Sequence, residues 1–242
     1  MKSKLSLFSF AAVLILFASC NISGVTGNKN VVKQTRTVNE NFTAVKISQG
    51  INLFLSQGDT VSIVTEADEN IQELLKTEVE NGVLKIYFTE QVGKTEAKNV
   101  YVTMPEINKI TASSAADVKG KSVISSDDLT LNASSGADIE IEIDAAKLSC
   151  ESSSGADIDI IGNCGTANFR ASSGADIDAK ELISENVSAG TSSGADISVF
   201  ANQSLTANAS SGGDISYYGN PEKLDVNTSS GGDINKRNTH DK

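Results

Sequence analysis

The sequence predicts an all-β protein, a right-handed parallel β-helix (solenoid) of about 19-residue coils with an irregular N-terminal β cap that contains one short helix. A six-residue phrase carries this prediction. It recurs seven times between Ser113 and Ile234, as SSAADV once, SSGADI four times and SSGGDI twice. The residues around each phrase alternate between apolar and polar, which is the period of a half-buried strand.

The N-terminus resembles a lipoprotein export signal. Two lysines precede the apolar stretch Leu5–Phe17, and the residues Ala-Ser-Cys20 follow it. The run LFASC resembles a bacterial lipobox, although Phe17 stands where that pattern prefers Leu. We expect a signal peptide over 1–19, and a lipidated Cys20 with a polar tether over 20–35 that holds the chain on a membrane. An ordinary export signal cut nearby is the alternative.

Residues 36–110 are expected to cap the first coil, because an open β-helix end would expose unpaired strand edges. Asn81-Gly82 is a turn signal, and Asp68–Lys76 is the one helical candidate, with Asp68 available as its N-cap. Five runs have the composition of strands: Phe42–Ser48, Ile51–Ser56, Val61–Glu66, Val83–Phe88 and Val100–Met104.

The repeats occupy residues 111–235. Apolar or small residues stand one, three and five positions before each phrase, and the alternation resumes after it, for example at Ile139 and Ile141. Each coil therefore carries two short strands with SSGAD as the corner between them, and loops such as 162–165 and 219–223 close the coils. Identical positions should pair in parallel, and the right hand follows by analogy with βαβ crossovers. Residues 236–242 are expected to form a disordered tail.

The repeated Asp is the first candidate for chemistry, because stacking would place seven carboxylates in one column about 4.8 Å apart. Our preferred interpretation is structural, with each Asp accepting hydrogen bonds from Ser hydroxyls and corner amides. The alternative is a row of cations, since Ca²⁺ prefers several oxygen ligands. The ladder consists of Asp117, Asp138, Asp157, Asp176, Asp196, Asp214 and Asp233.

A second acidic group should share one outward face of adjacent coils. Paired carboxylates of this kind serve in glycoside hydrolysis, which makes a polysaccharide-active enzyme an alternative function. Only six basic residues lie between 113 and 234, however, so an acidic polymer would be repelled, and we expect no enzyme. The group comprises Asp138, Glu140, Glu142, Asp157, Asp159, Asp176 and Asp178.

Composition excludes several classes of function. The formal net charge of −11 makes nucleic acid an improbable partner. The single histidine, His240, lies in the tail, so a Ser-His-Asp set cannot be assembled, and zinc and haem have no plausible ligand set. No cofactor is expected. Cys150 and Cys164 could form a disulfide inside one coil or remain separate buried thiols.

Several motifs in a fixed order carry a family resemblance. Gly50-Ile51-Asn52 in SQGINLFLSQGD, VTEADENI at 64–71, VLKI at 83–86, VTMP at 102–105 and the serial SSGADI phrases together resemble the putative auto-transporter adhesin, head GIN domain family. The resemblance covers roughly residues 40–235. It implies a β-helical domain of exported proteins, many of them lipoproteins of Gram-negative envelopes, and it brings no shared catalytic residues.

These observations predict an exported, lipid-anchored binding or structural module of the cell envelope, adhesin-like, with polar contacts to glycans or surface proteins. Its expected location is the outer membrane, on the periplasmic side or at the cell surface. The alternatives are the polysaccharide-active enzyme and a calcium-stabilised rod. The oligomeric state stays open.

Overall fold

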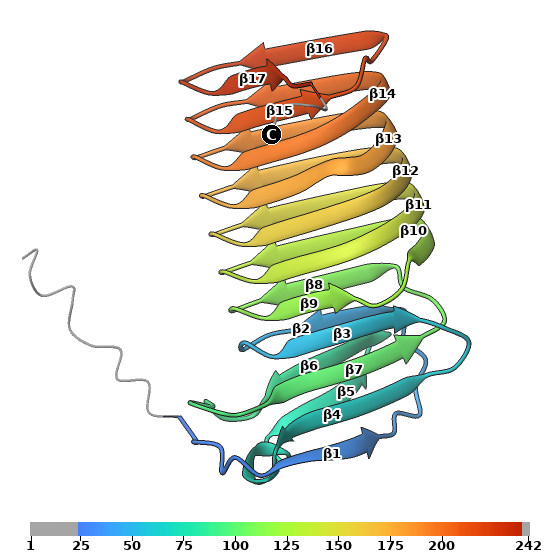
Figure 1. The fold of residues 1–242 in the computed structure, drawn as a ribbon, viewed down its shortest axis with the longest axis vertical. Coiled ribbons are helices and arrows are strands. Elements are labelled where there is room, and N and C mark those ends of the chain that lie inside the picture. Colours follow the sequence, from blue (N-terminus) through green and yellow to red (C-terminus); the bar gives the residue numbers. More distant parts are fainter. Residues whose placement is uncertain (1–23, 239–242) are drawn as a thin grey trace, which may run out of the picture.

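The computed structural model describes residues 24–238, which form one 17-stranded sheet wound into a stack of coils (Figure 1). The predicted parallel β-helix is confirmed. One continuous core of buried apolar side chains runs from Phe42 to Tyr217. The predicted signal peptide, Cys20 and the last four residues lie outside the described part of the chain.

The repeats stack with identical positions side by side, as the sequence predicts. Asp138 pairs with Asp157, and Asp157 with Asp176, and the same register continues to the last coil. Every pairing in this region is parallel. The strands are β8 (Lys109–Ser113), β9 (Asp117–Gly120), β10 (Ile124–Ser134), β11 (Asp138–Ser153), β12 (Asp157–Ser172), β13 (Asp176–Ser192), β14 (Asp196–Ala209), β15 (Asp214–Tyr218), β16 (Lys223–Thr228) and β17 (Asp233–Lys236).

The second bend of each central coil differs from the prediction. Strands β11 to β14 run unbroken from Asp to the next corner, so 162–165 belongs to β12 and is not a loop. Coil-to-coil pairing continues through the bend, for example between Ile143 and Gly162, which keeps the backbone in strand geometry. At this bend of the described repeats the strands break at 121–123, between β9 and β10, and at 219–222, between β15 and β16.

The SSGAD corner is a tight turn whose second Ser and Gly both have positive φ, 57° at Ser135 and 67° at Gly136. Two successive left-handed residues are the geometry of a type I′ turn. Backbone bonds also run between corners, from Ser135 N–H to Ser153 O at 3.3 Å and from Asp138 N–H to Ala116 O at 2.9 Å. The Ala after the Gly points inward and is fully buried, as at Ala137.

The core is thin because each inward residue lies on the equivalent residues of its neighbours. Phe169, the largest fully buried side chain, lies between Cys150 and Ala189 in adjacent coils. The small neighbours leave room for the ring, as close packing requires. Cys150 and Cys164 are both free thiols, so of the two predicted states the separate buried thiols are observed.

The cap continues the coils in a different order along the chain. The β2/β3 layer lies between β6/β7 and β8/β9, all in parallel, and antiparallel β1, β4 and β5 close the end (Figure 1). Its elements are β1 (Val31–Arg36), β2 (Ala44–Ile47), β3 (Asn52–Gln57), β4 (Ser62–Asp68), the 3₁₀ helix η2 (Glu69–Ile71), β5 (Leu75–Glu80), β6 (Val83–Phe88) and β7 (Lys98–Met104). The five predicted strands and the Asn81-Gly82 turn are confirmed.

Two predictions for the cap are wrong. The helix expected over Asp68–Lys76 is only the three-residue η2, because Leu75 already pairs with Phe88 in an antiparallel strand. The Asp68 side chain caps nothing; it is fully buried and accepts backbone N–H bonds from Lys29, Glu96 and Ala97 at 2.8, 2.9 and 3.0 Å.

The ordered domain also extends further at both ends than the predicted tether and tail allow. Residues 31–35, expected in the tether, belong to β1, which pairs with β4 along its whole length. Lys236, expected in the tail, is the last residue of β17. In both places backbone pairing to an existing strand orders a segment whose composition is mostly polar.

The Gly that replaces Ala in the SSGGD phrases has a steric cause. A Cβ at Gly213 would lie 2.7 Å from Thr191 Oγ1 and 3.0 Å from two backbone atoms. A Cβ at Gly190, near the C-terminal end of β13, would meet nothing within 4 Å.

We therefore expect Gly213→Ala to lower the free energy of unfolding by about 1–3 kcal/mol through overpacking. Gly190→Ala should leave it unchanged or raise it by up to about 1 kcal/mol, because the unfolded chain loses entropy without strain in the native state. Urea unfolding of the two variants checks the contrast. Equal effects would contradict the close approach at this corner.

Candidate functional site

Stacking in register gives the rod two long outward surfaces, one on each side of the SSGAD corners. The strand segments that follow the corners carry the Asp ladder and, two residues later, Lys119, Glu140, Asp159 and Asp178 in neighbouring coils. We call this surface the acidic face. Glu142 lies beside Ile161, so it is not joined there by a second carboxylate.

Most ladder carboxylates do not make the hydrogen bonds that the sequence predicts; Asp196 and Asp214 accept backbone amides, and no described Ser hydroxyl donates to the ladder. Among residues 24–238, Asp214 accepts a hydrogen bond from Asp233 N–H at 3.2 Å, and the backbone N–H of Asp214 bonds to the Asp196 carboxylate. Buried hydroxyl groups donate to backbone carbonyls instead. Ser152 Oγ, for example, donates to Ala156 O at 2.6 Å. Backbone bonds hold the corners, and six of the seven Asp residues are exposed, so water solvates their charge.

Partial burial and neighbouring carboxylates together perturb the more crowded positions of the acidic face. Partial burial, followed by the charges of Asp157 and Asp117, raises the pKa of Asp138. Partial burial and then the charge of Asp178 raise the pKa of Asp159. Two lysines moderate this repulsion, with Lys119 Nζ 3.8 Å from Glu140 and Lys180 Nζ paired with Asp178.

The carboxylates do not converge on a point. In the part of the chain that the structure describes, no group of three His, Cys, Asp or Glu side chains could hold a metal ion. Ca²⁺ prefers six to eight oxygen ligands around one centre, whereas these residues are spread along a flat sheet. The geometry gives the calcium-stabilised rod no support.

The ladder column continues into the cap as amides. Asn52 pairs with Asp117 on one side and Asn99 on the other, and Asn52 Nδ2 donates to Asn99 Oδ1 at 2.9 Å. Gln49 and Gly50 before it have φ values of 63° and 64°, so the GIN phrase forms one more corner of the same kind. The sequence signal for this corner was Gln-Gly before Ile-Asn, which matches Ser-Gly before Ala-Asp in the repeats.

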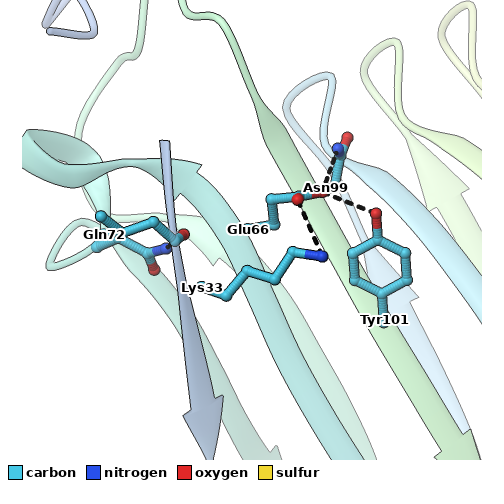
Figure 2. A network of polar contacts seen from close by, with 6 residues as sticks. Lys33, Glu66, Gln72, Asn99 and Tyr101 are labelled. Carbon is cyan, nitrogen blue, oxygen red and sulfur yellow. Dashed lines mark hydrogen bonds and ion pairs between the residues drawn. The ribbon is translucent and has the colours of Figure 1, made fainter. Parts of the chain in front are cut away.

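Beyond Asn99 lies a polar cluster that joins β1 to the rest of the cap (Figure 2). Glu66 accepts hydrogen bonds from Asn99 Nδ2 at 3.0 Å and Tyr101 OH at 2.7 Å, and Lys33 Nζ lies 3.1 Å from its other oxygen. The Asn99 and Tyr101 bonds lower the pKa of Glu66. Gln72 donates to Val32 O at 2.8 Å, so the cluster has a structural role.

The segments that precede the corners form a groove of about 710 Å³ with polar walls. One column of outward residues runs through Asn132, Glu151, Arg170, Gly190 and Asn208, and a second consists of serines. We call this hollow the polar groove. Its lining comprises Asn132, Ala133, Ser134, Glu151, Ser152, Ser153, Arg170, Ala171, Ser172, Gly190, Thr191, Ser192, Asn208 and Ser210.

Gly190 shapes the floor of the polar groove. Its neighbours in the column, Arg170 and Asn208, carry side chains, whereas Gly190 leaves the backbone uncovered and open space above it. Arg170 and Glu151 approach to 3.5 Å with most of their side chains in solvent. The sequence predicted polar contacts to glycans but not this hollow, whose signal was a Gly where the other repeats place side chains.

A second hollow, of about 800 Å³, lies at the opposite bend of the first coils. Its lining includes Gln57, Asp127, Asp128 and Asp144. Gln57 closes one side by donating to Pro105 O and Ser125 O at 2.9 and 3.1 Å. Three carboxylates on an open surface favour neither an apolar nor an acidic ligand.

The cysteine thiols offer no nucleophile. Burial raises the pKa of both, that of Cys164 to about 11, and Cys150 is fully enclosed in the core. Thiolate, the reactive form, is therefore scarce at neutral pH.

Comparisons with known proteins support the architecture. The family described as putative auto-transporter adhesin, head GIN domain, matches residues 41–221. A putative adhesin from Bacteroides fragilis is similar in structure, with a TM-score of 0.82 and 20% identity over 88% of this chain and 100% of that one. No curated protein matches the chain in sequence. Residues 24–238 contain no helix long and apolar enough to cross a membrane.

Two further solved structures are similar over 88% of this chain. A putative lipid binding protein from Parabacteroides distasonis gives a TM-score of 0.71 at 22% identity and is covered over 99% of its length. A putative adhesin from Parabacteroides merdae gives 0.73 at 19% identity and is covered over 98%. At these identities the likeness shows the fold alone.

The acidic face and the cap predict opposite responses to pH. Because the pKa values of Asp138, Asp159 and Asp196 are raised in the folded state, their ionisation disfavours folding, and stability should rise as pH falls from neutral toward about 4. The lowered pKa values of Glu66 and Asp68 give stability that is lost as pH falls through their folded-state pKa values, below 4.5 and 3.8 respectively.

We expect the melting temperature to be highest at mildly acidic pH, a few degrees above its value at pH 7.5. Thermal unfolding between pH 3 and pH 8 measures this profile. Asp138→Asn with Asp159→Asn should flatten the rise between neutral and mildly acidic pH and leave the loss at lower pH. A melting temperature that falls steadily from neutral pH downward would contradict the argument.

Proposed function

The chain belongs to the putative auto-transporter adhesin, head GIN domain family, and we propose that it is an exported, lipid-anchored module of the bacterial envelope that binds glycans in its polar groove. Family and fold neighbours alike suggest an adhesin-like, non-enzymatic role. The observation that carries the glycan proposal is the groove itself, where hydroxyl, amide and guanidinium groups from successive coils line one continuous hollow.

Several properties of the polar groove suit a neutral, extended polymer. Ser and Asn side chains can both donate and accept hydrogen bonds, as sugar hydroxyls do. The serine column repeats the same hydroxyl group along the rod, so one chain could make equivalent contacts with successive coils. The acidic face on the other side of the corners would repel uronate polymers. For that reason we do not propose a polysaccharide-active enzyme.

Lipid anchoring at Cys20 would place the cap near a membrane, because Val25 already belongs to the folded cap. Val25 pairs with Val92, and Val25 N–H donates to Gln91 O at 2.8 Å, so ordered structure starts far earlier than the predicted tether allows. Four residues of extended chain span at most about 14 Å. A lipid on Cys20 would therefore hold the cap close to the membrane surface.

The charge distribution supports an upright rod. Residues 24–125 carry eleven basic and twelve acidic side chains, whereas residues 126–238 carry six basic and eighteen acidic ones. An anionic membrane surface repels the acidic coils more strongly than the nearly neutral cap. The cap would then lie at the membrane and the last coil at the distal tip.

Filling the polar groove should abolish glycan binding. We expect Gly190→Trp to reduce binding to immobilised neutral polysaccharides at least tenfold, because the new ring starts from a Cβ in open space and fills the floor of the groove. Ser198→Trp, at an outward position on the acidic face, is the matched control and should bind like the unmodified protein. If no polysaccharide of a broad panel binds, or if both variants bind equally, the groove is not the site.

Removing the acceptor thiol should release the protein from the membrane. We expect the unmodified protein to sediment with envelopes and to require detergent for extraction, whereas Cys20→Ser should be soluble. Protease added to intact cells should digest the unmodified protein if it stands at the surface, and lysed cells give the control for cleavability. A Cys20→Ser protein that still needs detergent would contradict the anchor.

A further inference from the structure

The C-terminal end of the rod is an open core. Leu224 and Val226 in β16 are 48% and 46% exposed, although they continue the inward columns of the coil before. Their counterparts there, Leu205 and Ala207, are 1% and 0% exposed. The two side chains are exposed because no further coil lies on them.

The two ends of the rod are treated differently. At the N-terminal end, antiparallel strands close the stack, as Figure 1 shows. At the C-terminal end, β16 pairs only with β14 and β17 only with β15, within the described residues. One edge of each strand thus offers backbone donors and acceptors beside apolar side chains, a combination that attracts another strand.

The charge of this last coil sets it apart from the acidic stack. Residues 222–237 carry three acidic and three basic side chains, so two copies would not repel each other there. From this balance and the open edge we propose that the last coil is a homodimer interface. Two copies meet tail to tail about a twofold axis, with β16 antiparallel to β16 of the partner.

A twofold axis near Val226 satisfies both strands of the coil. It places Val226 beside its own copy and Leu224 opposite Thr228 of the partner, so inward residues meet inward residues. In β17 the same axis lies near Asn235 and brings Asp233 opposite Arg237 of the partner, twice. When a strand carries opposite charges at its two ends, antiparallel pairing with a second copy of the same strand brings unlike charges opposite each other.

The inference goes beyond the proposed function, since a dimer in solution needs neither a membrane nor a glycan. Combined with the anchor at Cys20, it has a consequence that does rest on the proposed function. A tip contact would join rods that stand on two facing membranes.

Sedimentation of the chain from Gly24 onward, which holds every strand of the single core, tests the proposal. We expect twice the monomer mass at micromolar concentration. Val226→Lys should give a folded monomer, because the side chain is already exposed in the single copy. Val61→Lys is the matched control, since Val61 is 50% exposed in the cap, and it should remain a dimer. Circular dichroism confirms folding of each variant.

A charge exchange tests the register. Arg237→Asp should weaken the dimer at least tenfold, and adding Asp233→Arg in the same chain should restore it, because both inter-subunit pairs are then rebuilt with reversed sign. A monomeric unmodified protein, a dimer that survives Val226→Lys, or a double variant as weak as the single one would overturn the proposal.

Discussion

Parallel stacking in register is the constraint on which the rest of this structure depends. Each residue lies on the equivalent residues of the coils before and after, about 4.8 Å away, so whatever one repeat does is done again by its neighbours. An inward column must therefore share its volume, as Phe169 does with Cys150 and Ala189. An outward column multiplies its chemistry, so that one Asp in the phrase becomes a ladder of seven. The same rule that makes a regular core makes long uniform surfaces.

The carboxylate ladder shows how far this rule can be taken. Partial burial and then the like charges of adjacent coils raise the pKa values of Asp138 and Asp159. The corner tolerates these charges because backbone bonds hold successive corners together. Exposure to water screens most of the repulsion. In the cap, where a further charge would lie deeper between strands, the column changes to the amides of Asn52 and Asn99.

The sequence predicted what repeats and missed what does not. Spacing and alternation were enough to predict the coil, the register and the inward columns, because the phrase that defines them recurs seven times. The order of the cap layers could not be read, since β2/β3 inserts between later strands and no local pattern encodes that contact. The local sequence around Asp68 suggested a helix cap. Its actual partners, the backbone N–H groups of Lys29, Glu96 and Ala97, are distant in sequence, so the local pattern could not reveal them. The polar groove was missed for a related reason: Gly190 matters only beside Arg170 and Asn208.

A stack that repeats itself has no internal reason to end, so its ends carry information that the coils do not. The N-terminal end stops because antiparallel β1, β4 and β5 reverse the direction of pairing and cover the last inward side chains. At the other end β16 keeps the parallel register and the inward Leu224 and Val226, as if another coil followed. The corresponding charges change from strongly acidic to balanced at the same point. Two independent features, exposed apolar side chains and a balanced charge, thus occur on the same edge of the stack. A second copy of that edge has the same two features, so it can cover the apolar side chains without charge repulsion.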